Sequence, residues 1–307
     1  MRLYFVCRVL GLLLIVPCCL RIWGQNKPVW HEEAGYLEAR TDVERWPAPE
    51  TLVERLRSSD PQARLAALGL LGLGDKESHR KIWAQTVPTR VIGEDVITPD
   101  KVQLTYAALG SDSTQQAIVA MQSTQMTYAA VAVPTKHAWK RIALFSCWCK
   151  YEMAAGEDTL DDFVHLSPAP SGPILSPWHF DLVLSASGGG SGIYVKDEAH
   201  YRIADGKLRQ VVAFVSARRS CPMADPCELT KRWFTLTHFK GQTAGVLVEA
   251  RGRFPQTVDG SRTEVDIRDL QYRHLRRASC RLYKWNEHAF RYAPVGAFEA
   301  CSKAPFQ

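Results

Sequence analysis

The chain has 307 residues, of which 46% are hydrophobic and 23% charged, a composition typical of a globular protein rather than a disordered one. Its formal net charge is +6, and Arg2, Arg8 and Arg21 supply three of those charges within a segment that has no Asp or Glu. The remaining excess of three is small, and no basic stripe is interleaved with aromatic residues. We therefore expect no nucleic-acid partner.

Residues 1–24 are predicted to be a secretory signal peptide. Arg2 and Arg8 flank an apolar run that Pro17 and Arg21 interrupt before it is long enough to span a bilayer comfortably. The mature chain is predicted to have no transmembrane span. It should be secreted or periplasmic.

The cleavage site leaves alternatives open. Gly24 offers a small residue before Gln25, so we expect the mature chain to begin at Gln25. Lipidation of Cys18 or Cys19 would instead give a lipid-anchored envelope protein, although Pro17 fits that cleavage poorly. An uncleaved segment would act as a membrane anchor.

Cysteine usage favours an oxidising compartment. Nine cysteines are present, and an even number of them remains after the signal segment: Cys147, Cys149, Cys221, Cys227, Cys280 and Cys301. An even number behind an export signal indicates disulfides, and Cys221 and Cys227 bracket a short loop that favours local pairing. The complete connectivity stays open. Without Cys-x-x-Cys pairs we predict no metal site, and we predict no cofactor.

Helical patterns occupy the first part of the mature chain. A short helix is predicted within residues 30–45, and a second over residues 51–57. Asp60 and Pro61 are typical of an N-cap followed by proline in the first helical position, and the third helix should end at Gly72 or Gly74.

The segment from Leu52 to Asp75 resembles a HEAT-type helical repeat. The resemblance is carried by the Asp60-Pro61 turn, Arg64, the Ala66-Ala67 pair and Leu71-Gly72. It implies a helix–turn–helix unit and a protein-binding surface. It covers about one repeat, whereas solenoids need several neighbours, so we expect the unit to pack on the next domain. The composition alone predicts an amphipathic helical hairpin.

From Val91 the periodicity changes to two. Short alternating or apolar runs are predicted as strands over residues 102–106, 117–121, 127–133, 139–149, 178–185, 232–237, 245–251, 264–273, 281–285 and 289–292. We therefore predict an α+β fold, mainly β, with a helical module over residues 25–90. An antiparallel β-sandwich or barrel-like domain should follow over residues 91–307.

Asp205-Gly206 is the strongest local signal, because this pair supplies the two positive φ angles of a type I′ hairpin turn. The hairpin would place Ile203 opposite Leu208, Tyr201 opposite Gln210 and Ala199 opposite Val212. The buried face should then contain these residues: Tyr201, Ile203, Leu208, Val212 and Phe214. Arg202 and Arg209 would face water or an acidic neighbour on the other side.

The glycine-rich run at residues 187–192 precedes this hairpin. Ile193 stands where both a dinucleotide-binding loop and a nucleophile elbow require glycine. We therefore interpret the run as a turn or bulge between strands.

Acidic residues and histidines recur together at spacings that place them on one strand face. His179 lies two residues before Asp181, and Glu198 two residues before His200. A carboxylate can orient a histidine for general acid–base work, so these four residues are weak catalytic candidates. The alternative is that they are polar residues without a catalytic role, because no nucleophile or metal partner accompanies them.

The C-terminal part is rich in arginine. Weak ligand-binding candidates are Arg273, Arg276, Arg277 and Trp285, which suit an anionic glycan, a lipid headgroup or an acidic protein. The alternative is a solvated sheet face with cross-strand ion pairs.

These observations predict an exported, non-enzymatic protein of the envelope or exterior that binds a protein or glycan. One alternative is a hydrolase that acts on envelope glycan or peptide through an Asp/Glu–His pair. Another is a structural or assembly factor whose helical hairpin docks a partner.

Overall fold

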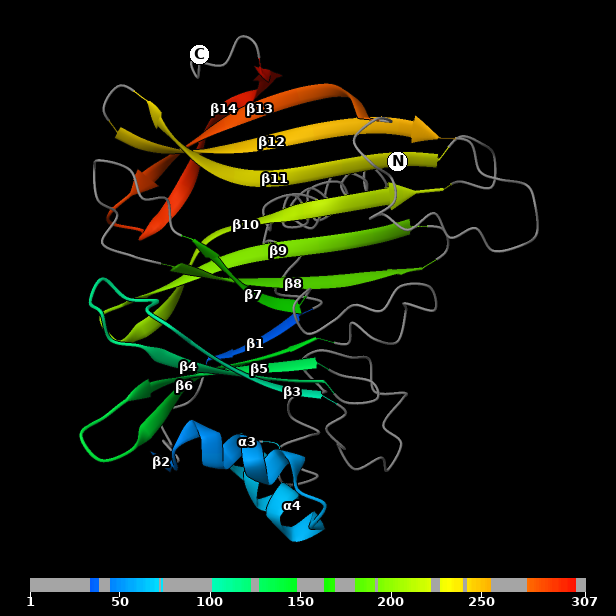
Figure 1. Cartoon of the computed structure of the whole chain (residues 1–307). Helices are drawn as coiled ribbons and strands as arrows, with labels where there is room; N and C mark the ends of the chain where they lie inside the picture. The colour runs from blue at the N-terminus through cyan, green and yellow to red at the C-terminus, as the bar shows by residue number, and fades with distance from the viewer. Residues whose placement is uncertain are drawn as a thin grey trace, which may run out of the picture.

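The computed structural model describes residues 34–38, 45–71, 73, 101–122, 127–147, 163–168, 180–190, 193–221, 227–239, 242–254 and 275–301. Two antiparallel sheets and two helices make up these residues, so the predicted α+β, mainly β, class is confirmed. Figure 1 shows the helices at one end of the molecule and the larger sheet at the other. The predicted signal segment lies outside the described residues, as does the strand predicted over residues 264–273.

The helical hairpin consists of α3 (Pro49–Arg57) and α4 (Pro61–Leu70). As predicted, Asp60 caps α4: its side chain accepts a hydrogen bond from the Gln62 N–H at 3.0 Å. The helix predicted within residues 30–45 is wrong where the structure describes this segment. Residues Ala34–Glu38 form strand β1, because pairing with a distant strand outweighs local helix preference.

The smaller sheet has the order β1-β6-β5-β4-β3, and β2 also pairs with β6. Its other strands are β2 (Arg45–Trp46), β3 (Lys101–Ala107), β4 (Gln116–Gln122), β5 (Thr127–Pro134) and β6 (Trp139–Cys147). All of the pairings are antiparallel. The middle strands β4 and β5 are buried on both faces along most of their length.

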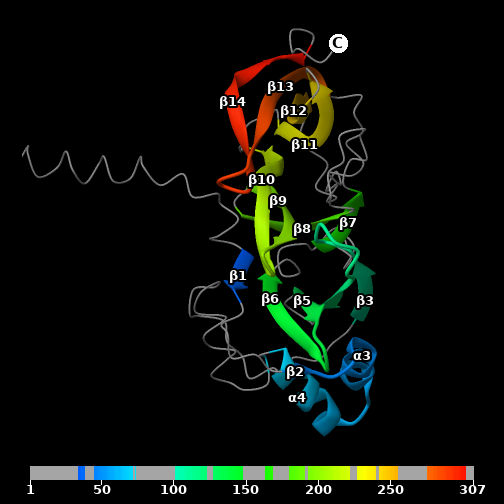
Figure 2. The same ribbon diagram turned by 90° about the vertical axis from the view of Figure 1, so that its left-hand side faces the viewer.

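The larger sheet runs in sequence order from β7 to β14. Its strands are β7 (Val164–Pro168), β8 (Phe180–Gly190), β9 (Ile193–Ala204), β10 (Lys207–Ser220), β11 (Cys227–Phe239), β12 (Gln242–Phe254), β13 (Leu275–Asn286) and β14 (Arg291–Ala300). Figure 2 shows that β11 to β14 curl away from the plane of the preceding strands. This curl brings the C-terminal strands toward the middle of the sheet.

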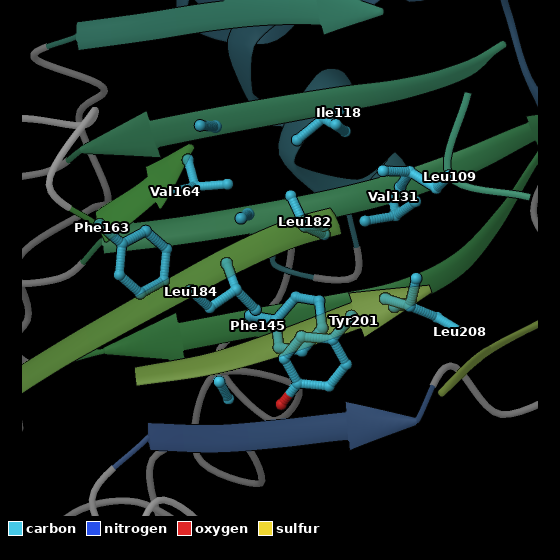
Figure 3. Packing of buried hydrophobic residues seen from close by; sticks show 14 of the residues in the cluster. Leu109, Ile118, Val131, Phe145, Phe163, Val164, Leu182, Leu184, Tyr201 and Leu208 are labelled. Carbon is cyan, nitrogen blue, oxygen red and sulfur yellow. The ribbon is translucent and has the colours of Figure 1, made fainter. Parts of the chain in front are cut away.

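Each face of the smaller sheet has its own core. On one face, α3 and α4 pack against apolar residues of β4, β5 and β6, and the Trp46 indole donates to the Leu70 carbonyl at 2.9 Å. On the other face, the smaller sheet packs against the first strands of the larger one. Figure 3 shows Phe145 and Tyr201 in this second core, where their ring centroids are 5.1 Å apart. The predicted boundary at residues 90–91 lies outside the described residues and stays a prediction.

The predicted hairpin forms with the expected turn. Asp205 and Gly206 have φ angles of 52° and 70°, and Ile203 pairs with Leu208 and Tyr201 with Gln210. A bulge at Val211 then shifts the register, so Val212 pairs with His200 instead of Ala199. Consequently Val212 and Phe214 leave the core that contains Tyr201 and join an aromatic cluster with β11, β13 and β14, which corrects the predicted face.

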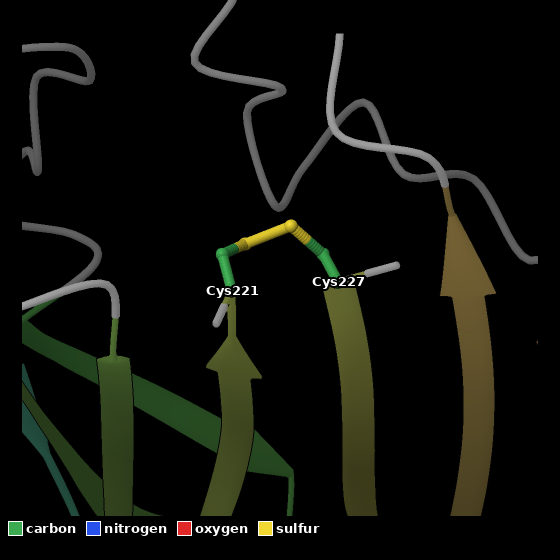
Figure 4. The surroundings of a disulfide bond; sticks show 2 residues. All are labelled: Cys221 and Cys227. Atoms are coloured by element: carbon green, nitrogen blue, oxygen red, sulfur yellow. A yellow bond between two sulfur atoms is a disulfide. The ribbon is translucent and has the colours of Figure 1, made fainter. Parts of the chain in front are cut away.

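The prediction of a turn or bulge over residues 187–192 is wrong for residues 187–190, which extend β8 and pair with the start of β9 at Ile193, whereas residues 191–192 lie outside the described residues. Two disulfides lie in the larger sheet. Cys221–Cys227 closes the connection between β10 and β11 (Figure 4), and Cys280–Cys301 joins β13 to the end of β14. Cys147 ends β6, and Cys149 lies outside the described residues.

Candidate functional site

Strands β8 and β9 bring three of the four predicted acid–base residues together with an arginine. Leu182 pairs with Tyr201, so Asp181 lies opposite Arg202 in the same register. Strand alternation places Glu198, His200 and Arg202 on one face of β9, away from the core that contains Tyr201. His179 lies outside the described residues.

Short polar contacts join these side chains into one network. The Arg202 guanidinium donates from Nε to Asp181 Oδ1 at 2.5 Å and from Nη2 to Asp181 Oδ2 at 3.2 Å. His200 Nδ1 lies 3.5 Å from Asp181 Oδ2, and His200 Nε2 lies 2.9 Å from Glu198 Oε1. Arg202 is only 1% exposed, which makes it one of the largest fully buried side chains in the described part of the chain.

Aromatic rings from β10 and from the curled strands cover this network. The ring centroids of Phe214 and Phe234 lie 6.1 and 6.0 Å from that of His200. The Arg202 guanidinium carbon lies 5.7 Å from the ring centroids of both Trp285 and Tyr292, on β13 and β14. Cation–π attraction between these groups ties the C-terminal hairpin to β9.

The network is electrostatically balanced. Burial disfavours the imidazolium, but hydrogen bonds to Asp181 and Glu198 and their negative charges outweigh it and raise the pKa of His200. Burial also opposes ionisation of Asp181, yet His200 and Arg202 hold its pKa below the ordinary value. Both shifts favour an imidazolium at His200 beside an ionised Asp181.

This geometry restricts what His200 can do chemically. Both ring nitrogens lie against carboxylates, and an ionised carboxylate only accepts hydrogen bonds. The favoured form of His200 is therefore the imidazolium, with both N–H groups engaged. In that form it has no lone pair with which to act as a general base. The catalytic roles of Asp181, Glu198 and His200 stay predictions.

Arg202 is the member of the network that the sequence reasoning missed. We expected it to face water or an acidic neighbour, and the structure places it against an acidic neighbour, Asp181, in a buried position. Arg209 meets Asp205 at 3.1 Å in a more exposed pair. The sequence signal for a buried ion pair was the spacing of Asp181 and Arg202 about the end of the glycine-rich run. This spacing places the two residues opposite each other once β8 and β9 pair.

Another buried carboxylate lies on one of the curled strands. Glu249 on β12 is 2% exposed and accepts hydrogen bonds at 2.7 Å from Arg232 Nε and from Arg251 Nε. Burial opposes its ionisation, but these arginines outweigh it and lower its pKa. It is therefore a carboxylate at neutral pH.

The predicted ligand residues separate in the structure. Trp285 is half-buried in the aromatic cluster, where its ring centroid lies 5.0 Å from those of Phe290 and Tyr292. Arg276 and Arg277 lie on β13, and Arg277 pairs with Arg251 of β12. Arg273 lies outside the described residues.

In comparisons with family models, curated proteins and solved structures, nothing matches this chain. Within the described ranges, no helix is long and apolar enough to cross a membrane. In the same ranges, no three His, Cys, Asp or Glu side chains are grouped to hold a metal ion. Any function must be argued from the residues themselves.

Proposed function

We propose that this chain is an exported, non-enzymatic binding protein of the cell envelope or exterior. The observation that carries the proposal is the pair of disulfides, Cys221–Cys227 and Cys280–Cys301. Disulfides persist in oxidising compartments, and the predicted signal segment is consistent with such a destination. The partner is a protein or a glycan of that compartment.

The His200 network favours binding over catalysis. A hydrolase using this histidine would need a free ring nitrogen near a nucleophile or water, whereas both nitrogens face carboxylates. Its covering rings, Phe214 and Phe234, belong to a packed aromatic cluster. The network is suited to holding the curled strands in place.

The test is intact mass of the protein recovered from an exporting host, alkylated with and without prior reduction. We expect a chain that begins at Gln25 and whose four bonded cysteines resist alkylation until the protein is reduced. A retained N-terminus with alkylatable cysteines at these positions would refute export.

The hydrolase alternative needs its own measurement. The double variant Glu198→Gln, His200→Gln should leave any envelope-degrading activity of the preparation unchanged if the network is structural. Loss of a turnover activity in a variant that still unfolds cooperatively would favour the hydrolase.

A further inference from the structure

Arginines gather on one face of the curled strands β11, β12 and β13. In the ladder, Arg232 pairs with Glu249, Thr230 with Arg251, and Glu228 with Arg253. On the next strand, Arg277 pairs with Arg251 and Arg281 with Leu247. Directly paired residues, and residues two apart on one strand, lie on the same face, so four arginines define what we call the arginine face: Arg232, Arg251, Arg253 and Arg281.

The opposite face of the same strands is quite different. Its described ladder positions carry mainly small or apolar residues with two lysines, among them Leu229, Lys231, Trp233, Val246, Val248, Ala250, Cys280, Leu282 and Lys284. An ordinary solvated sheet would carry mixed charges where it meets water. Here the guanidinium groups are segregated to one side.

The carboxylates on the arginine face are too few to neutralise it. Among its described ladder positions the acidic residues are Glu228 and Glu249, against four arginines. Glu249 is shared by Arg232 and Arg251, and Glu228 accepts from Arg253 Nη2 at 2.8 Å. The side chains of Arg251 and Arg253 are nevertheless 66% and 72% exposed, so much of each guanidinium meets water.

The backbone sets the spacing of the Cα atoms that carry these arginines. Arg251 and Arg253 are two residues apart on one strand, which separates their Cα atoms by about 7 Å. Phe298 on β14 lies 5.9 Å from the Arg232 guanidinium carbon and 6.0 Å from that of Arg281, which supports these two side chains from one side.

We propose that the arginine face binds an anionic glycan, a polysaccharide that carries carboxylate or sulfate groups. Guanidinium groups bind such oxyanions in a bidentate manner, and an array of them suits a polymer with repeated charges. Firm attachment to a bilayer combines basic residues with an apolar side chain that inserts beside them. The exposed Trp233 cannot serve, because it lies on the opposite face. This inference rests on the proposed export, since such glycans lie outside the cell.

The test uses the mature, oxidised protein on immobilised dextran sulfate, with neutral dextran as the reference surface. We expect saturable binding to dextran sulfate that weakens as salt is added, and none to neutral dextran. The double variant Arg251→Gln, Arg253→Gln should bind about tenfold more weakly. The matched variant Arg55→Gln, Lys101→Gln removes the same charge at exposed positions outside the curled strands and should bind as the wild type does.

Arg251→Gln also removes one partner of Glu249, so a charge-retaining pair is needed. The variant Arg251→Lys, Arg253→Lys keeps the charge but not the bidentate geometry. Its affinity for dextran sulfate should lie between that of the wild type and that of the glutamine variant. If the matched variant loses as much affinity for dextran sulfate as Arg251→Gln, Arg253→Gln does, only net charge matters and the proposal is overturned. Stronger binding to anionic vesicles or to poly-glutamate than to dextran sulfate would also overturn it. If the protein is exported and disulfide-bonded but does not bind dextran sulfate, this inference is refuted and the proposed function is unaffected.

Discussion

Replacing Arg202 by methionine should destabilise the protein strongly, because it would leave the Asp181 carboxylate buried without its principal cation. Asp181 is 6% exposed and Arg202 is 1% exposed, so water cannot take the place of the missing guanidinium. The same substitution removes the contacts of Arg202 with the rings of Trp285 and Tyr292. Breaking one partner of a buried ion pair typically costs about 3–5 kcal/mol.

A double-mutant cycle separates the ion pair from general loss of packing. Asp181→Leu should also cost about 3–5 kcal/mol, because it strands the Arg202 guanidinium. The double variant Arg202→Met, Asp181→Leu replaces the pair with apolar groups, and should be about 2–3 kcal/mol more stable than the sum of the single effects predicts. Urea unfolding of the oxidised proteins, monitored by tryptophan fluorescence, gives the free energy of unfolding of each variant relative to the wild type.

Additive effects would refute this reasoning. If each single variant costs less than about 1 kcal/mol and the double variant equals their sum within about 0.5 kcal/mol, Arg202 and Asp181 do not interact energetically. The buried network would then not hold the curled strands to β9.

Two further predictions concern packing and pH. Gly245→Ala should destabilise the protein by about 1–3 kcal/mol, because the added methyl group would overlap the Phe234 ring. Gly69→Ala in α4 meets no atom within 4 Å and should instead stabilise by about 0.5–1 kcal/mol; equal urea midpoints for the two variants would contradict this. The raised pKa of His200 means that the folded state holds its proton more tightly than the unfolded state. Protonation of His200 therefore stabilises the fold fully below the ordinary pKa of about 6.5, and this stabilisation is lost as pH rises through the folded-state pKa. The urea midpoint of the wild type should therefore fall with rising pH across that range more than the midpoint of His200→Gln does. If the two midpoints change in parallel with pH, His200 does not contribute to stability in this way.

Features that depend on neighbouring residues could be predicted from the sequence. The Asp205-Gly206 turn follows from backbone sterics within two residues, and the Asp60 cap from a side chain that reaches its own helix. Both are confirmed because no distant partner competes with them. The predominance of antiparallel strands follows similarly from the period-two pattern and the closely spaced turns.

Features that depend on distant partners could not be predicted in this way. Residues Ala34–Glu38 form a strand because β6 lies beside them, and β6 is about a hundred residues away in the chain. The bulge at Val211 has no signal of its own, yet it moves Val212 and Phe214 to another core. Arg202 is buried because Asp181 neutralises it, which is evident only after β8 and β9 are paired.

The distribution of charge in the larger sheet follows access to water. At the covered end, Arg202 is matched by Asp181 and His200 lies between two carboxylates, because an unmatched charge there would be costly. The face of β13 that carries Trp285 beside Arg202 continues to Arg281 and across to Arg251 on β12, where arginines outnumber carboxylates. Such an excess is tolerable only where guanidinium groups such as that of Arg253 remain hydrated. The excess charge therefore lies where an anionic ligand can reach it, whereas the matched charge lies where the fold needs support.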